Sequence, residues 1–455
     1  MAYRANLLSA IFVALTLATC VLICARLGIR PTLAAIAALA LGAVGTVWGA
    51  ATVAEVNPLH LLFAALIVHR ALVWEDRRSP SDLVLGGLLI GLSIGNHLLT
   101  LFIAPFVALF VLWAGRREIR ARPALLLMPV AGLVVGLAVY LYIPIAASFS
   151  PPLPYNHPTT WSGFVFLVTG EQFRGQFDFL SPKGPGEFIH YLPELWRVLL
   201  ARGTAIVPVV GFAGLIVLLV RRPAFGLACL GILVTGLYIW ANYLRLEHYL
   251  LVPWLLLAIG MTVALETVAR MLEGTVGGFL ARARAGDGDS RDRAGEGLGR
   301  LGGAVVLAAG LVFALVLGAR NWSASDRSDD HSGSAYVDAV FSTLPPNSAI
   351  LVWWDAASPL WYASYVDGRR PDVLIVDDTN IVYEGWRTRE ARIATLICQR
   401  PVFIIRPGDP ETSLTDAYQL AQVLTVPAAY GGPTAFATRP IFRVTPKDPN
   451  SCGMP

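Results

Sequence analysis

The sequence predicts a polytopic α-helical membrane bundle followed by a C-terminal α/β domain, and two observations support this fold class. Of the 455 residues, 55% are hydrophobic and only 15% are charged, which is typical of a multi-pass membrane protein with a smaller soluble part. From Ser334 onward, short β-branched runs alternate with helical stretches. This alternation of strand and helix predicts a small α/β domain with a mostly parallel sheet.

About ten membrane segments are expected, because apolar runs of spanning length follow one another through the first 320 residues. Every strongly basic link between them falls on one side. Since cytoplasmic loops carry the excess of Arg and Lys, that side is expected to be inside, with the N-terminus and the C-terminal domain outside. Besides the hairpin described next, the predicted spans are Leu7–Ala25, Thr32–Ala54, Leu59–Trp74, Pro123–Ala147, Val198–Val220, Phe225–Trp240, Leu250–Met271 and Leu301–Leu317.

The stretch Leu83–Trp113 predicts a short helical hairpin. It is apolar except for four polar residues near its middle, among them Asn96 and His97. As one helix it would measure about 46 Å, well beyond the roughly 30 Å of the hydrocarbon core. Both flanks are basic, so both ends are expected on the cytoplasmic side. The alternative is one long tilted helix in which Asn96 and His97 bond to neighbouring helices.

Candidate functional residues gather in the segments expected at the outer face. Glu55 lies where a span emerges, and the alternative for it is a solvated loop end. The stretch 161–177 is an aromatic run with a few charges, which also fits a segment lying in the membrane interface. The cluster at 242–249 carries more charge than an aromatic belt requires. The candidates are Glu55, Asn57, His60, Asn96, His97, Arg174, Asn242, Arg245, Glu247 and His248.

Several function classes lack a motif in this sequence. No nucleophile elbow, HExxH zinc motif or Walker motif is present, and no glycine-rich phosphate loop follows a predicted strand. The net charge of +4 reflects Arg in short loops and does not suggest nucleic acid. From spacing alone, a transporter and a lipid-linked transferase both remain open.

The predicted domain boundaries follow the changes from apolar to polar composition along the chain. Residues 1–272 form the membrane bundle with an outer loop at 148–196, and 273–300 form a flexible cytoplasmic linker rich in Gly, Arg and Asp. Residues 301–319 form the last membrane helix, and 320–455 the extracytoplasmic α/β domain. Of the five cysteines, Cys398 and Cys452 fall in that last domain and are expected to pair if it lies outside.

Several motifs, in order, resemble a family of bacterial multi-pass proteins related to protein O-mannosyltransferases, within the GT-C glycosyltransferases. They are YRANLLSAIFVALT, WGAATVAEVNPLHLLFAAL, GLSIGNHLLTLFIAP, TGEQFRGQF, NYLRLEHYLLVP and RPDVLIVD, which together run from Tyr3 to about Asp409. The resemblance implies a bacterial inner-membrane enzyme with an extracytoplasmic active site, a polyprenyl-phosphate sugar donor and a protein hydroxyl or glycan as acceptor. An acidic residue near the start of a span recurs in such enzymes, and Glu55 matches that position.

The sequence departs from this family at its start. Members resemble one another in an earlier span and a first outer loop that carries the expected catalytic base, whereas this chain begins at MAYRANLLSA, just after that loop. Two alternatives follow: the start codon is placed too late, or this is a truncated copy. In either case we expect the chain as written to be inactive or severely impaired.

The leading hypothesis is an inverting GT-C-like glycosyltransferase with Glu55 as base or orienting group. No cofactor is assigned beyond the polyprenyl-phosphate donor, no metal is assigned, and the expected partners are membrane lipid, donor and acceptor. One rival is a transporter or flippase for a lipid-linked or polar solute, against which the lack of a visible inverted repeat counts. A further rival is a non-catalytic scaffold.

Overall fold

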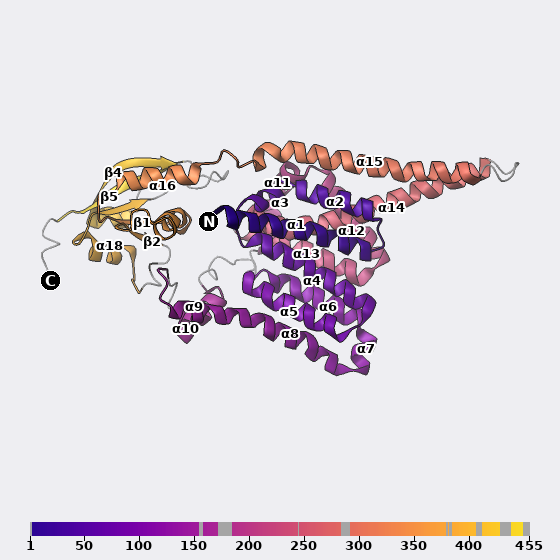
Figure 1. The fold of residues 1–455 in the computed structure, drawn as a ribbon, viewed down its shortest axis with the longest axis horizontal. Helices are drawn as coiled ribbons and strands as arrows, with labels where there is room; N and C mark the ends of the chain where they lie inside the picture. The colour runs from indigo at the N-terminus through magenta and orange to yellow at the C-terminus, as the bar shows by residue number, and fades with distance from the viewer. Residues whose placement is uncertain are drawn as a thin grey trace. The chain divides into compact units, whose positions relative to one another are not determined.

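The computed structural model describes residues 2–153, 158–171, 184–243, 245–283, 292–378, 381, 385–405, 412–427 and 438–448. The chain forms two compact units (Figure 1). The helical bundle comprises Met1–Tyr142 and Gly170–Asp326, and the α/β unit comprises Ile143–Thr169 and Arg327–Pro455.

The bundle contains the membrane segments that the composition predicts. The described residues hold six helices that are long and apolar enough to cross a membrane, two bent helix pairs and two shorter apolar helices, in agreement with the expected ten. Its helices are α1 (Ala2–Arg26), α2 (Pro31–Ala43), α3 (Gly45–Thr52), α4 (Asn57–Arg77), α5 (Pro80–Asn96), α6 (Thr100–Ala114), α7 (Arg116–Ala121), η1 (Pro123–Leu126), α8 (Leu127–Leu137), η2 (Ala138–Leu141), α11 (Gly184–Gly203), α12 (Ile206–Arg221), α13 (Pro223–Asn242), η5 (Glu247–Leu250), α14 (Leu251–Ala283) and α15 (Asp292–Ser325).

The predicted hairpin is confirmed. Helix α5 ends because His97 adopts an extended conformation, with φ −155° and ψ 126°. The two basic flanks meet at the other end, where Arg78 Nε lies 3.6 Å from Glu118 Oε1. In the turn, the hydroxyls of Ser93 and Thr100 lie 2.6 Å apart. The alternative of one long helix is therefore wrong.

Glycines hold α8 against α5 in a closely packed pair. A Cβ on Gly87 would lie 1.9 Å from the carbonyl oxygen of Pro129, and one on Gly132 would lie 1.9 Å from that of Val84. The backbones therefore touch, as small residues permit between membrane helices. This contact fixes the first helix of the hairpin.

The prediction of one continuous span over Val198–Val220 is wrong, because the chain bends near the start of this stretch. The chain turns by 105° between α11 and α12, at Thr204, whose φ is +59°. The predicted span is therefore part of a bent helix pair and not one straight helix. A second bend, of 70°, separates α2 from α3, so Thr32–Ala54 is also a broken segment.

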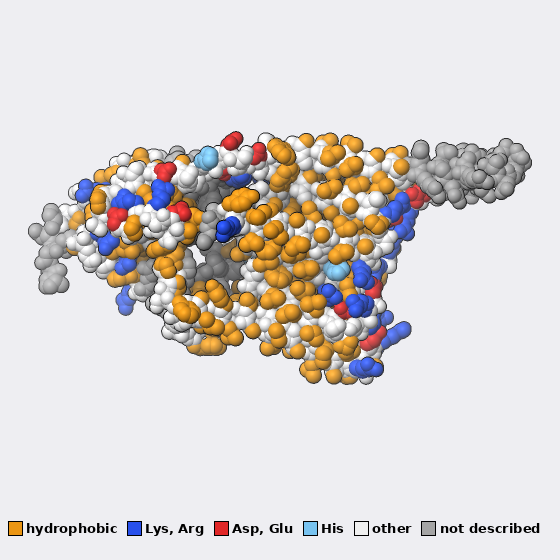
Figure 2. All heavy atoms as spheres, viewed as in Figure 1, with side chains coloured by type: hydrophobic (Ala, Val, Ile, Leu, Met, Phe, Trp, Pro, Cys, Tyr) orange, Lys and Arg blue, Asp and Glu red, His pale blue; other side chains and the backbone are white. Residues whose placement is uncertain are grey.

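Charged side chains concentrate at one end of the bundle. In Figure 2, the visible face of the bundle is mostly hydrophobic, and blue and red side chains collect along the edge that includes α7. We refer to this end, where α1, α4, α6 and α12 finish, as the basic end. The opposite end carries Glu55, the hairpin turn and the segment before α14, and we refer to it as the polar end.

The region 273–300 is helical in most of its described part. Helix α14 continues to Ala283, and α15 begins at Asp292. Residues 284–291 lie outside the described residues. The cytoplasmic location of this region remains a prediction.

The α/β unit is built around a five-stranded sheet with the order β2-β1-β3-β5-β4. Its strands are β1 (Ala349–Val352), β2 (Leu374–Asp377), β3 (Val402–Ile405), β4 (Tyr418–Pro427) and β5 (Thr438–Pro446). Its helices are α9 (Tyr142–Ser148), α10 (Trp161–Val168), α16 (Ser332–Thr343), α17 (Trp354–Trp361), η6 (Tyr362–Val366), α18 (Arg389–Ile397) and α19 (Thr412–Ala417).

The sheet is mixed, which corrects the expectation of a mostly parallel one. Strand β1 pairs in parallel with β2 and β3, as predicted. Strand β5, however, is antiparallel to both β3 and β4. The predicted helix Leu414–Leu424 stops at Ala417, and its remainder is β4. Pairing with β5 decides the conformation of this segment.

The cysteines divide as expected between the two units. Cys20, Cys24 and Cys229 are free and buried in the bundle. Cys398 in the α/β unit is disulfide-bonded. Its expected partner Cys452 lies outside the described residues.

Candidate functional site

The centre of the polar end is Glu55, in the connection between α3 and α4. Its carboxylate accepts a hydrogen bond from Asn57 Nδ2 at 3.1 Å and lies 3.9 Å from His248 Nδ1. The Glu55 side chain is 39% exposed, whereas Asn57 is buried. The structure thus presents one carboxylate to an open side, held by an amide behind it.

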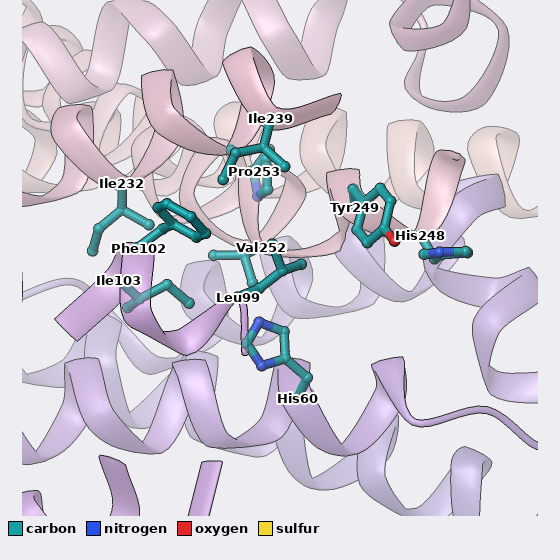
Figure 3. A pocket seen from close by; sticks show the side chains of 11 residues that line it. His60, Leu99, Phe102, Ile103, Ile232, Ile239, His248, Tyr249, Val252 and Pro253 are labelled. Atoms are coloured by element: carbon teal, nitrogen blue, oxygen red, sulfur yellow. The ribbon is translucent and has the colours of Figure 1, made fainter. Parts of the chain in front are cut away.

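A second set of polar side chains lies just inside this carboxylate, between α4 and the hairpin turn. The ring centroids of His60 and His97 are 5.1 Å apart. Thr100 Oγ1 lies 3.4 Å from His60 Nδ1. Figure 3 shows His60 rising from α4 toward Leu99, with His248 and Tyr249 on the segment before α14. Two imidazoles from distant stretches of the sequence therefore face one another.

The protonation of His97 follows from its hydrogen bond. Its Nδ1 accepts a bond from the backbone N–H of Leu99 at 3.2 Å. The proton of the neutral ring must then reside on Nε2. His97 consequently shapes the hairpin turn with one nitrogen and keeps a donor on the other. Asn96 adds a bond from its Nδ2 to the carbonyl of Val56 at 3.1 Å, which ties the turn to the connection that carries Glu55.

Glu247 is engaged differently from Glu55. Arg202 at the end of α11 donates two hydrogen bonds to its carboxylate, from Nε and Nη2, each of 2.8 Å. Thr46 Oγ1 donates a third at 3.2 Å. A bidentate guanidinium–carboxylate pair of this kind is strong and geometrically specific. It fixes the segment 245–249 against α3 and α11.

Arg245 sits on a strained backbone at the rim. Its φ is +49°, a conformation that costs energy in a residue with a side chain. The guanidinium lies 4.1 Å from the ring centre of Tyr191 and 3.8 Å from Glu194 Oε1. The side chain is 38% exposed, so its charge is accessible from the open side.

The structure brings together nine of the ten candidates in one end of the bundle, although one of them turns away from the others. Asn242 Nδ2 donates to the carbonyl of Tyr238 on its own helix. Arg174 lies outside the described residues. Sequence reasoning missed Arg202 and Thr46 as partners of Glu247. A charge inside the predicted span Val198–Val220 was the available signal for Arg202.

A pocket opens beside these residues, between α6, α13 and α14. Apart from His60, His248 and Tyr249, its lining is apolar: Leu99, Phe102, Ile103, Ile232, Gly236, Ile239, Val252 and Pro253 (Figure 3). Its volume is about 30 Å³, small beside the roughly 300 to 1,000 Å³ of typical small-molecule sites. A sugar therefore requires the more exposed space around Glu55 and Arg245.

The arrangement supports proton transfer and anion binding. Glu55 can accept a proton, the imidazoles of His97 and His248 can donate hydrogen bonds, and the guanidinium of Arg245 can pair with phosphate. Among the residues that the structure describes, no three His, Cys, Asp or Glu side chains are grouped in a way that could hold a metal ion.

Comparisons with known proteins agree with this architecture. Residues 1–120 match the family model described as the protein O-mannosyl-transferase TMEM260 N-terminal domain. This match covers Glu55, Asn57, His60 and the hairpin turn. No curated protein matches the chain.

Among solved structures, the chain is similar to ArnT from Cupriavidus metallidurans. The structure bound to undecaprenyl phosphate shares 13% identity with a TM-score of 0.51, over 97% of this chain and 84% of that one. The apo state gives 14% identity and a TM-score of 0.49, over 96% and 83%. The chain therefore has an ArnT-like fold: a polytopic helical membrane bundle with a C-terminal mixed sheet.

Proposed function

We propose that this protein is an inverting, GT-C-like glycosyltransferase. It transfers a sugar from a polyprenyl-phosphate donor to an extracytoplasmic acceptor, either a protein hydroxyl or a glycan. The observation that carries the proposal is the approach of His248 to Glu55 at 3.9 Å, next to the hairpin turn with His97. Arg245 lies three residues before His248 in the same segment. The O-mannosyl-transferase match over residues 1–120 and the fold shared with an ArnT structure that contains undecaprenyl phosphate support it.

In this proposal Glu55 is the general base or orients the acceptor. As base, it removes the proton of the acceptor hydroxyl while that oxygen forms a bond to the anomeric carbon of the sugar. The bond from that carbon to the phosphate oxygen breaks, and the polyprenyl phosphate leaves with the electron pair. Glu55 suits the role better than Glu247, because Glu247 already accepts three hydrogen bonds, two of them from Arg202.

The leaving phosphate is assigned to the cationic and N–H groups beside Glu55. Arg245 presents an accessible guanidinium, and His248 lies 3.9 Å from the Glu55 carboxylate. Pre-aligned donors of this kind stabilise charge that develops in a transition state. Arg174 remains a further phosphate candidate on sequence grounds. Asn96 and the Nε2–H of His97 line the inner wall, and Asn57, His60 and Asn242 support it.

The proposed orientation places the polar end outside the cytoplasm in a bacterial inner membrane, with the α/β unit extracytoplasmic. The basis is the concentration of Arg at the basic end. Cysteine labelling of intact cells tests this arrangement. Positions 78 and 117 are expected to be protected together, and labelling of the two from opposite sides would contradict it.

The activity test is sugar transfer from a polyprenyl-phosphate sugar by the purified protein. Full activity would show that the base lies among the residues present here and would contradict the impairment expected from the sequence. Glu55→Gln keeps the shape of the side chain and removes its basicity, so turnover is expected to fall by about 10² to 10⁴. The matched control is Glu118→Gln, which removes an acid at the basic end and should leave turnover unchanged. Equal turnover of Glu55→Gln and the native protein would refute the assignment. Movement of the donor across the membrane without sugar transfer would favour a transporter.

A further inference from the structure

A cavity far from the proposed active site opens at the basic end, between α1 and α4. It is lined by Leu22, Ala25 and Arg26 of α1 and by His69 and Asp76 of α4, and its volume is about 610 Å³. The proposed glycosyltransferase activity assigns no role to this cavity.

One side of the cavity is apolar and continues onto the outer surface of α1. Leu22 is 52% exposed, although it lies within a candidate membrane span. Leu8, Ile11 and Leu15 of the same helix are also exposed. With spacings of three, four and seven residues, these side chains follow one face of α1. An acyl chain in the surrounding membrane can therefore run along α1 from the mouth of the cavity.

The other side of the cavity carries one accessible charge of each sign. Arg26 Nη1 lies 2.8 Å from Asp76 Oδ2, and the two side chains are 37% and 40% exposed. By contrast, Asp82, which pairs with Arg70, and Glu266, which pairs with Arg30, are each only 4% exposed. The Arg26–Asp76 pair therefore keeps free coordination sites on both partners.

The neighbouring cations do not make the cavity strongly positive. Arg70, next to His69, pairs with Asp82. Arg222 donates one hydrogen bond to the carbonyl of Arg26, and its other end pairs with Glu75. The local charges of these paired side chains consequently balance. His69 adds a polar ring about two helical turns before Asp76, nearer the middle of the membrane.

We propose that this cavity binds the headgroup of a phospholipid that carries both a phosphate and a primary ammonium group. The phosphate binds Arg26 and His69, the ammonium binds Asp76, and one acyl chain lies along Leu22. A headgroup with one charge of each sign is complementary to a balanced pair, whereas a purely anionic one would meet the Asp76 carboxylate. A quaternary ammonium has no N–H to donate to Asp76.

Native mass spectrometry of the full-length protein tests the proposal. The protein is equilibrated in detergent with equal amounts of phosphatidylethanolamine, phosphatidylglycerol and phosphatidylcholine, and bound lipids are counted. The native protein is expected to retain phosphatidylethanolamine preferentially. Asp76→Asn should reduce that preference about tenfold, since it removes one charge-assisted hydrogen bond. The matched control is Glu118→Gln, which breaks another exposed pair at the same end and should keep the preference.

A second variant separates lipid binding from folding. Leu22→Trp fills the mouth of the cavity without changing a charge, and Leu22 is exposed, so the fold should tolerate it. It is expected to lose the bound lipid. Equal retention of the three lipids by the native protein, preference for phosphatidylglycerol, or an unchanged preference in both Asp76→Asn and Leu22→Trp would each overturn the proposal.

Discussion

At the basic end of the bundle, Arg30 pairs with Glu266 and Glu273, and Arg222 pairs with Glu75. At the polar end, the ionisable partner of Glu55 is His248, at 3.9 Å. The same helices build both ends. The pairs at the basic end join the start of one helix to the body of another, whereas Glu55 and Arg245 keep capacity for a ligand.

The Arg202–Glu247 pair belongs to the polar end but resembles the basic end in its geometry. Its two hydrogen bonds of 2.8 Å join α11 to the segment before α14. This pair therefore acts as the support of the site, and His248 is the residue next to it. Substitutions at the Arg202–Glu247 pair should lower turnover by displacing His248. Substitutions at the joining pairs of the basic end, such as Arg30–Glu266, should lower stability and leave turnover per folded molecule unchanged.

The largest of the remaining effects is expected from Glu266→Gln at the basic end. Glu266 is buried and accepts bonds from Arg30 Nε at 3.2 Å and Arg270 Nε at 2.6 Å. Loss of its charge should lower the free energy of unfolding by about 1.5 to 3 kcal/mol. Thermal unfolding in detergent measures this change. Turnover per folded molecule should stay the same, and a loss of turnover without a loss of stability would break the contrast between the two ends.

Arg202→Lys should have the next largest effect, on turnover. Lysine keeps the charge but cannot form both bonds of the guanidinium. We expect about a tenfold loss of turnover from displacement of His248, equivalent to about 1.4 kcal/mol, with the pH dependence of the rate retained. The comparison variant is Arg320→Lys, because Arg320 makes a long bond of 3.4 Å to the carbonyl of Leu200. Equal effects of the two substitutions would argue against a positioning role.

Two substitutions at His97 should separate its two nitrogens. The shorter amide introduced by His97→Asn would place an acceptor where Nδ1 now receives the Leu99 N–H, so this variant should preserve stability and weaken donor binding several-fold. His97→Gln places its amide nearer the position of Nε2 and loses the bond within the turn. It should lower stability by about 1 kcal/mol. Titration with the sugar donor and thermal unfolding of both variants separate the effect on donor binding from the effect on stability. Equal changes in both variants would contradict distinct roles for the two nitrogens.

The smallest expected effect lies in the α/β unit. The Ser332 hydroxyl, Arg327 and the Ser332 N–H hold the pKa of Asp330 down to about 2, compared with about 3.9 in an unfolded chain. The stabilisation is therefore complete above about pH 4 and is lost as the pH falls toward 2. Because these groups are exposed, it should amount to less than about 1 kcal/mol. Unfolding of the native protein and Asp330→Asn should differ at pH 6, and the difference should shrink as the pH falls and vanish only below about pH 2; a constant difference would contradict this origin.

The hairpin and its polar turn could be predicted from the sequence, because the membrane restricts where charged and polar residues lie. Basic flanks on both sides of Leu83–Trp113 predict the hairpin, since one crossing would have placed Arg78 and Arg117 on opposite sides. The polar residues of the hairpin turn, Asn96 and His97, could be identified because such residues are costly in a bilayer. Their meeting with Glu55 and His248 needed the folded structure, because it joins stretches about 40 and 150 residues apart.

Other features depended on contacts that the sequence does not display. The segment Leu414–Leu424 has apolar residues at helical spacing, and its pairing with β5 overrides that pattern from Tyr418 onward. The bend at Thr204 was missed because the apolar run of α12 is preceded by the partly apolar helix α11. As a result, Arg202 could not be recognised as the partner of Glu247.

The binding position of the donor phosphate decides whether the polar end is the site of sugar transfer. Undecaprenyl phosphate carrying a photoreactive diazirine beside the phosphate can be crosslinked to the purified protein, and the modified peptides mapped by mass spectrometry. Crosslinks are expected in residues 55–60, 96–100 and 245–249, and excess undecaprenyl phosphate should reduce them. Competed crosslinks confined to the basic end, around Arg26 and His69, would contradict sugar transfer at the polar end.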